Sequence, residues 1–327
     1  MGSDRSSPFV RHVGHVTDRF DALLPFVAVP LLLSVLEFET VRRALDPGPG
    51  FSINLEFALP SPLLDLWSFA DPPPAGSHTD SSHGGGSSVV PGGPTDRGTT
   101  GSAAGGTDVT IETPLETIVM PLGDVGVGIL GWLATALLVY AAISAVISAG
   151  YLGGIDRCLR GEPAAILACI SEYAPRLFLY HLAVFAAFVA VLPVLAVVPP
   201  LVVLAIPVVI VLGYLFYAVP FLFVVDDAAF LEAFRRSYGF ALEGGPYLRF
   251  ALWHVAVAVV ASILLSIAVS AGGVGFVLAL VVAAPLALVL TGATVSFVGE
   301  LAGGDGPGAP TRSRPGSSSD DGVGSVR

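Results

Sequence analysis

Two histidines in matching surroundings are the residues of this sequence best suited to chemistry. His181 and His254 each lie about one helical turn inside a long apolar run, and imidazole changes its charge near neutral pH. The segments 176–184 and 249–257 that hold them share five of nine residues, an Arg and the His among them. An ionisable group inside a membrane span is a candidate functional residue. The pattern therefore predicts either one shared proton or ligand site, or two anchors at the membrane interface, where a neutral histidine beside aromatic residues costs little.

The other reactive residues form none of the motifs that mark the common enzyme classes. The sequence has no Gly-x-Ser-x-Gly, no His-Glu-x-x-His, no phosphate-binding loop and no cluster of acids within one apolar run. Cys158 and Cys169 fit no metal or redox spacing. We therefore expect no catalytic residue, no metal and no cofactor, and a protein without enzymatic activity.

Composition predicts a protein of the cell membrane. Of the 327 residues, 54% are hydrophobic and only 13% are charged, and runs of about 20 apolar residues are typical of spanning helices. All 15 basic residues are Arg, and the formal net charge is −11. An acidic chain without Lys lacks the basic footprint of a nucleic-acid-binding protein, and this composition favours a haloarchaeal source.

The expected fold is an all-α polytopic membrane protein with about six transmembrane helices, cytoplasmic interfacial helices in a repeated unit, and a small hairpin-like loop outside. Its four parts are residues 1–45, an amphipathic helix and the first span; 46–123, an acidic extracytoplasmic loop; 124–301, a five-helix membrane domain; and 302–327, a disordered cytoplasmic tail. Strict alternation over 51–59 and 109–113 predicts two strands that pair as a hairpin. The Gly- and Ser-rich tract at about 71–107 predicts disorder.

The distribution of arginine predicts the orientation. The apolar runs expected to span are 22–36, 125–152, 177–198, 201–225, 250–270 and 274–298. Six spans put both termini on one side together with twelve arginines, against three on the other side. The positive-inside rule then places the termini in the cytoplasm and the acidic loop outside. Five or seven spans remain alternatives, because the first run is short.

A charged interruption between two apolar runs predicts an interfacial helix near residues 228–243. It is too short and too charged to span, so its aromatic face is expected to enter the lipid interface. Asp226 and Asp227 are expected to cap its first turn, and Glu232 to pair with the Arg four residues later. The residues proposed to matter in this helix are Phe230, Phe234, Arg235, Arg236 and Tyr238.

The same unit is predicted a second time near residues 163–176, where Glu172 and Arg176 stand at pairing distance on a helix. Each unit would then consist of an interfacial helix followed by a membrane hairpin. The residues that carry a resemblance to known proteins are Asp226, Glu232, Ala233, Arg236, Ser237 and Tyr238. In this pattern the chain resembles the YciC-like proteins and the membrane domain attached to some glycerophosphodiester phosphodiesterases. The resemblance covers about 125–300 and implies a membrane protein of no known chemistry.

Two classes of function are compatible with these observations. The favoured class is a non-enzymatic integral membrane protein, a scaffold or an envelope-homeostasis factor that senses or shapes lipid. The alternative is a transporter or lipid-handling permease that uses the interface between the two repeats. The expected partners are membrane lipids, with a second copy of the chain or another membrane protein as further possibilities and no nucleic acid.

Overall fold

The computed structural model describes residues 7–45, 59–72, 108–112, 117–121, 127–198 and 200–303. The N-terminal elements are α1 (Pro8–Asp18), α2 (Phe20–Leu23), the 3₁₀ turn η1 (Leu24–Val27), α3 (Ala28–Leu36) and α4 (Phe38–Leu45). Two strands follow, β1 (Asp108–Glu112) and β2 (Thr117–Pro121). The remaining helices are α5 (Val127–Leu159), α6 (Ile166–Val197), α7 (Leu201–Phe216), α8 (Val219–Val225), α9 (Phe230–Glu243), α10 (Pro246–Ser270) and α11 (Gly273–Gly303).

The fold is that of a multi-pass helical membrane protein. Five segments of the described chain are long and apolar enough to cross a bilayer, namely Gly131–Leu159, Ile166–Val191, Val203–Val225, Pro246–Ser270 and Gly273–Gly303. The helices before the acidic loop could provide a sixth span, but α1 is bent by 75° from the segment Phe20–Leu36. That segment alone has 17 residues, slightly fewer than the roughly 20 that a bilayer requires. The prediction of about six spans is therefore confirmed as five or six.

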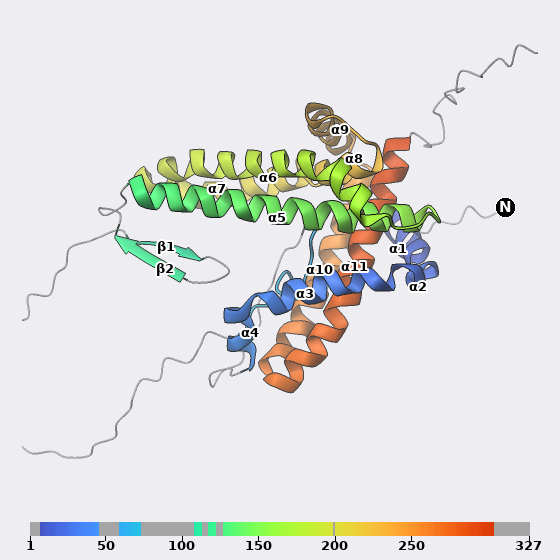
Figure 1. Ribbon diagram of the computed structural model, residues 1–327, viewed down its shortest axis with the longest axis horizontal. Coiled ribbons are helices and arrows are strands. Elements are labelled where there is room, and N and C mark those ends of the chain that lie inside the picture. Colours follow the sequence, from blue (N-terminus) through green and yellow to red (C-terminus); the bar gives the residue numbers. More distant parts are fainter. Residues whose placement is uncertain are drawn as a thin grey trace, which may run out of the picture.

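The long helices form two groups that meet at one end (Figure 1). Helices α5 and α6 pack side by side and extend in the same direction as α7, whereas α10 and α11 extend in another, and α3 packs across α11 and belongs to this second group. The short helix α8 lies where the groups meet, is buried from Val219 to Val224, and contacts α5, α6, α9 and α11. We call this the arginine-rich end, because α1 and α9 and most of the described arginines also lie there.

Glycines bring α5 into backbone contact with its neighbours. A Cβ added at Gly153 would lie 2.6 Å from the Cβ of Cys169 in α6. A Cβ added at Gly154 would lie 2.3 Å from the ring of Phe26 in η1. Small residues at such contacts are what allow helices to approach closely within a membrane.

The two predicted repeat units differ in the structure. The second contains a separate helix, α9, which ends at Gly244 and Gly245, whose φ angles of 63° and 51° few other residues adopt. The first has no such glycine pair, and its predicted interfacial helix at 163–176 is instead the beginning of the continuous helix α6. The prediction of a separate first interfacial helix is thus not met, and the repeat remains a prediction.

The acidic loop contains a hairpin with a different partner strand from the one expected. Strand β1 pairs antiparallel with β2, so that Val109 lies opposite Met120. Pairing β1 with a strand only a few residues away closes a much shorter loop than pairing it with residues 51–59 would. Of that predicted strand, residues 51–58 lie outside the described residues, as do almost all of the tract 71–107 and the tail beyond α11.

Candidate functional site

Helix α9 presents a buried and an exposed face at the arginine-rich end. Its inward side is formed by Ala233, Ser237 and Ala241, which are buried. The opposite stripe recurs at three- and four-residue steps and consists of Leu231, Arg235, Tyr238 and Leu242, all of them exposed. The exposed fraction of the three apolar members is 78%, 46% and 65% in that order. Arg235 therefore lies within the exposed apolar stripe.

Two of the aromatic residues predicted to enter lipid are half-buried against other rings of the protein. The ring of Phe230 stacks on Phe223 of α8 with the centroids 6.1 Å apart. The ring of Phe234 lies 5.4 Å from Phe216 and 6.2 Å from Tyr180. These contacts attach α9 to α6, α7 and α8, so the described role of the two phenylalanines is packing within the protein.

The acidic pair before α9 links three elements. The N-cap of α9 is Ala229, and no side chain caps the helix, which differs from the capping role predicted for the two acids. Asp226 pairs with Arg236 of α9, and Asp227 pairs with Arg176 of α6. The predicted partner of Arg236, Glu232, also lies within 3.9 Å. Arg176 was expected to pair with Glu172 along its own helix, but the acid from the α8–α9 turn is its partner.

Three arginines bind the C-terminal ends of helices to which they do not belong. The guanidinium of Arg19 donates to the carbonyl oxygen of Cys158 at the end of α5, at 3.3 Å. Arg160 donates to the carbonyl of Val225 at the end of α8, at 2.9 Å. Arg236 donates to the carbonyl of Ala302 near the end of α11, at 3.3 Å. Helix C-termini carry unpaired carbonyls and a partial negative charge, so these contacts satisfy the carbonyls and join the two helix groups.

Helix α1 is attached to the end of α11 by a second polar cluster. Arg11 Nη2 lies 2.6 and 2.5 Å from the two carboxylate oxygens of Glu300. His12 Nε2 lies 3.2 Å from the same carboxylate, and His12 Nδ1 lies 2.8 Å from the hydroxyl of Ser296. Because the carboxylate can only accept, Nε2 carries the ring proton and Nδ1 accepts from the hydroxyl. Burial lowers the pKa of His12 to about 4, although Glu300 opposes this shift, so the ring is neutral at pH 7.

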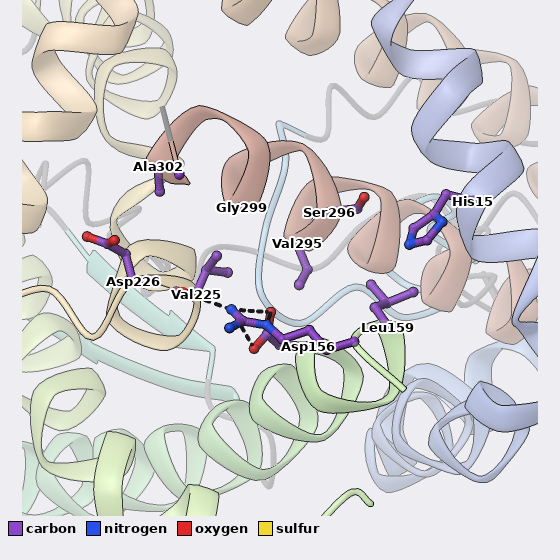
Figure 2. A pocket seen from close by; sticks show the side chains of 11 residues that line it. His15, Asp156, Leu159, Val225, Asp226, Val295, Ser296, Gly299 and Ala302 are labelled. Carbon is purple, nitrogen blue, oxygen red and sulfur yellow. Dashed lines mark hydrogen bonds and ion pairs between the residues drawn. The ribbon is translucent and has the colours of Figure 1, made fainter. Parts of the chain in front are cut away.

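A cavity of about 330 Å³ opens between these helix ends. Figure 2 shows it between Asp156 in α5, Asp226 after α8, and Ser296 in α11. The carboxylate of Asp156 accepts from Nε and Nη2 of Arg160 at 3.1 and 3.0 Å. Each carboxylate of the cavity is thus paired with an arginine, Asp156 with Arg160 in the lining and Asp226 with Arg236 outside it, so neither is free to bind a cation.

The two candidate histidines have different surroundings. His181 is half-buried, and its Nδ1 donates to the carbonyl of Leu177 at 2.8 Å, one turn earlier in α6. His254 is fully buried in α10, and neither of its ring nitrogens has a hydrogen-bond partner among the described residues. Matching sequence has therefore not produced matching sites, and the hypothesis of one shared site remains untested.

The residues that hold the arginine-rich end together were largely missed from the sequence. The sequence analysis gave no partner to Arg19, Arg160 or Glu300, although an Arg beside a helix end was the available signal. In the described part of the chain, no group of three or more His, Cys, Asp or Glu residues could hold a metal ion. The absence of a cofactor and of catalysis stays a prediction.

Comparisons with protein families, with curated proteins and with solved structures found no match to this chain. The resemblance to YciC-like proteins and to the phosphodiesterase membrane domain is therefore not tested by them. The class that the fold defines is a multi-pass helical membrane protein.

Proposed function

We propose that this protein is a non-enzymatic membrane scaffold or envelope-homeostasis factor that contacts the cytoplasmic lipid surface through α9. Both termini are cytoplasmic in this proposal, and residues 46–123 belong to the outer side. The observation that carries it is the exposed stripe of α9, in which Leu231, Tyr238 and Leu242 flank Arg235 beside the ends of the spans. An exposed apolar stripe at the level of lipid headgroups is the mark of an interfacial helix.

Apolar burial is the stronger of the two terms that could hold α9 to lipid. Burying a Leu side chain contributes roughly 1.5–3 kcal/mol and is not screened by salt. A basic residue beside an anionic leaflet contributes about 1 kcal/mol at ordinary salt. Arg236 is committed to Asp226 and to Ala302, which leaves Arg235 as the headgroup contact of this helix. At molar salt the Debye length falls to about 3 Å and weakens that contact further.

Spin labels on α9 test the proposal. In a variant without Cys158 and Cys169, labels at Leu231→Cys and Leu242→Cys should be more accessible to oxygen than to a polar nickel reagent in lipid nanodiscs. A label at Glu232→Cys, exposed on the same helix beside the stripe, is the matched control and should favour the nickel reagent. Replacing Leu231 and Leu242 with Ser should reduce the protection of α9 from hydrogen exchange in lipid, whereas Arg235→Gln should change it little at molar salt. Equal nickel accessibility at all three labels would show that α9 lies in water and would overturn lipid contact.

A lipid-handling permease is the second candidate, and buried His254 favours it. Neutral imidazole always carries one N–H, and burying an unpaired donor costs about 1–3 kcal/mol, so a purely structural role would be better served by an apolar residue. His254→Leu should therefore stabilise the protein if the ring only packs. If the ring serves transport, His254→Leu should leave stability unchanged or raise it. The variant should nevertheless fail to restore the lipid or solute phenotype that the parent restores in a deletion strain. If the His254→Leu variant still complements the deletion strain, the support for the permease is removed.

A further inference from the structure

Residues 59–72 are an ordered non-helical segment packed among the spans. Leu64, Leu66, Phe69 and Ala70 in this segment are almost completely buried. The sequence analysis assigned these residues to the acidic extracytoplasmic loop, whose tract at about 71–107 was expected to be disordered. Its density of Leu, Pro and aromatic residues was the signal that could have separated it from the polar residues that follow.

The two ends of the segment contact different helix groups. Leu59 packs directly on α7, because a Cβ added at Gly213 would lie 2.7 Å from its Cδ1. The indole of Trp67 stacks on Phe276 of α11 with the centroids 5.9 Å apart, and its Nε1 donates to the carbonyl of Ser34 in α3 at 2.7 Å. The segment therefore joins α7 to the group formed by α3, α10 and α11.

The first of these contacts lies at membrane depth. Gly213 is ten residues after the beginning and twelve before the end of the candidate span Val203–Val225, and so lies near the middle of that span. Phe276 is only three residues from the beginning of α11, at the end of the spans away from α9. Leu59 thus lies beside the middle of one candidate span, whereas Trp67 lies beside the first turn of another, an end position at which Trp is a favoured residue.

Several polar groups of the segment have hydrogen-bond partners, which a non-helical chain at this depth requires. Prolines at positions 60, 62 and 72 have no N–H to satisfy. The side chain of Asp65 accepts from the backbone N–H and the hydroxyl of Ser68 at 2.9 and 2.7 Å. The N–H of Leu66 donates to the hydroxyl of Ser34 at 2.9 Å, and the carbonyl of Leu66 accepts from the N–H groups of Phe69 and Ala70.

We infer that residues 59–72 form a re-entrant strap inside the membrane domain, seated between α7 and the α3–α11 pair. The strap joins the two helix groups from within, between the middle of α7 and the beginning of α11, away from the arginine contacts. It limits how far the groups can separate, and it divides the acidic loop into an embedded part and an external part.

Cysteine pairs test the strap in a background without Cys158 and Cys169. Leu59→Cys with Gly213→Cys should form an intramolecular disulfide under mild oxidation in native membranes, because a Cβ at position 213 would lie 2.7 Å from the Leu59 side chain. Leu59→Cys with Gly131→Cys is the matched control and should not, since nothing lies within 4 Å of a Cβ at Gly131. Each single variant is first shown to insert and to unfold at the parent's temperature. Absence of the disulfide in such folded protein would overturn the strap.

Depth is measured independently by thiol labelling. Ser61→Cys should react with a membrane-impermeant maleimide at least about tenfold more slowly than Ser82→Cys in the external part of the loop, because reaction requires local opening. Both variants should label equally after denaturation in SDS. Equal rates on intact membranes would show that the segment lies outside the bilayer and would overturn the proposal.

Discussion

Gly153→Ala should lower the free energy of unfolding of the membrane domain by about 1–3 kcal/mol, the usual cost of overpacking a filled contact. The added Cβ would lie 2.6 Å from the Cβ of Cys169, an atom next to the backbone that cannot move aside without shifting α6. Because α5 and α6 pack along their length, the shift would be felt over the whole pair. The measurement is reversible unfolding in mixed micelles, followed by circular dichroism.

The chain offers a control on the same helix and a rescue. Gly131→Ala adds the same methyl group to α5 where nothing lies within 4 Å, and it should be neutral or stabilising by up to about 1 kcal/mol because Ala favours helix. Cys169→Gly removes both close atoms and should restore part of the loss in the double variant. If Gly153→Ala behaves like Gly131→Ala, α5 and α6 do not approach as described.

Phe250→Ala should lower the free energy of unfolding by about 3–5 kcal/mol, the usual range when a buried aromatic side chain is removed. Phe250 is fully buried, and its ring stacks on Phe297 of α11 with the centroids 4.1 Å apart and 3° between the planes. Phe9 of α1 lies 5.4 Å from the same ring. Helix α1 should therefore lose its protection from hydrogen exchange in this variant, while α6 keeps its own.

Leu252→Ala is the comparison for this second prediction. Leu252 is 60% exposed on the same helix, so its replacement leaves no internal cavity and should change stability by less than about 1 kcal/mol. The variants Phe250→Ala and Phe297→Ala should not add, because each removes the same stacked contact. Equal effects of Phe250→Ala and Leu252→Ala would mean that α10 presents a different face to α11.

The sequence was sufficient to predict the spans and the separate helix α9, because long apolar runs and a charged interruption dominate the local signal. The gap between spans at Val198–Pro200 and the turn before Gly273 lie close to where they were expected. Partners distant in sequence were not predictable. Arg176 stands one turn from Glu172 but pairs with Asp227, which is 51 residues away, because the fold brings the α8–α9 turn against α6.

The orientation of α9 shows the same limit. Helical spacing correctly groups Leu231, Tyr238 and Leu242 on one side, but it cannot decide whether protein or lipid covers each side. Phe223 of α8 provides an aromatic surface for Phe230, and only the tertiary structure reveals that surface. Likewise, hydrophobic periodicity predicts strands and helices but cannot predict an ordered irregular segment such as 59–72. The order of that segment depends on contacts with Ser34 and Phe276, which are distant in sequence.

The arginine contacts at the helix ends have a consequence for biogenesis. The arginines of this end that are engaged within the folded protein are Arg11, Arg19, Arg157, Arg160, Arg176 and Arg236. While the chain leaves the translocon these side chains are still unpaired, and under the proposed orientation they act as retention signals that decide which way each span inserts. Once the spans have assembled, the same charges cap carbonyls and neutralise carboxylates. The charge that fixes topology during synthesis is therefore largely engaged within the mature protein, where Arg235 and Arg249 are the described arginines of this end with neither an ion pair nor a helix-end carbonyl as partner.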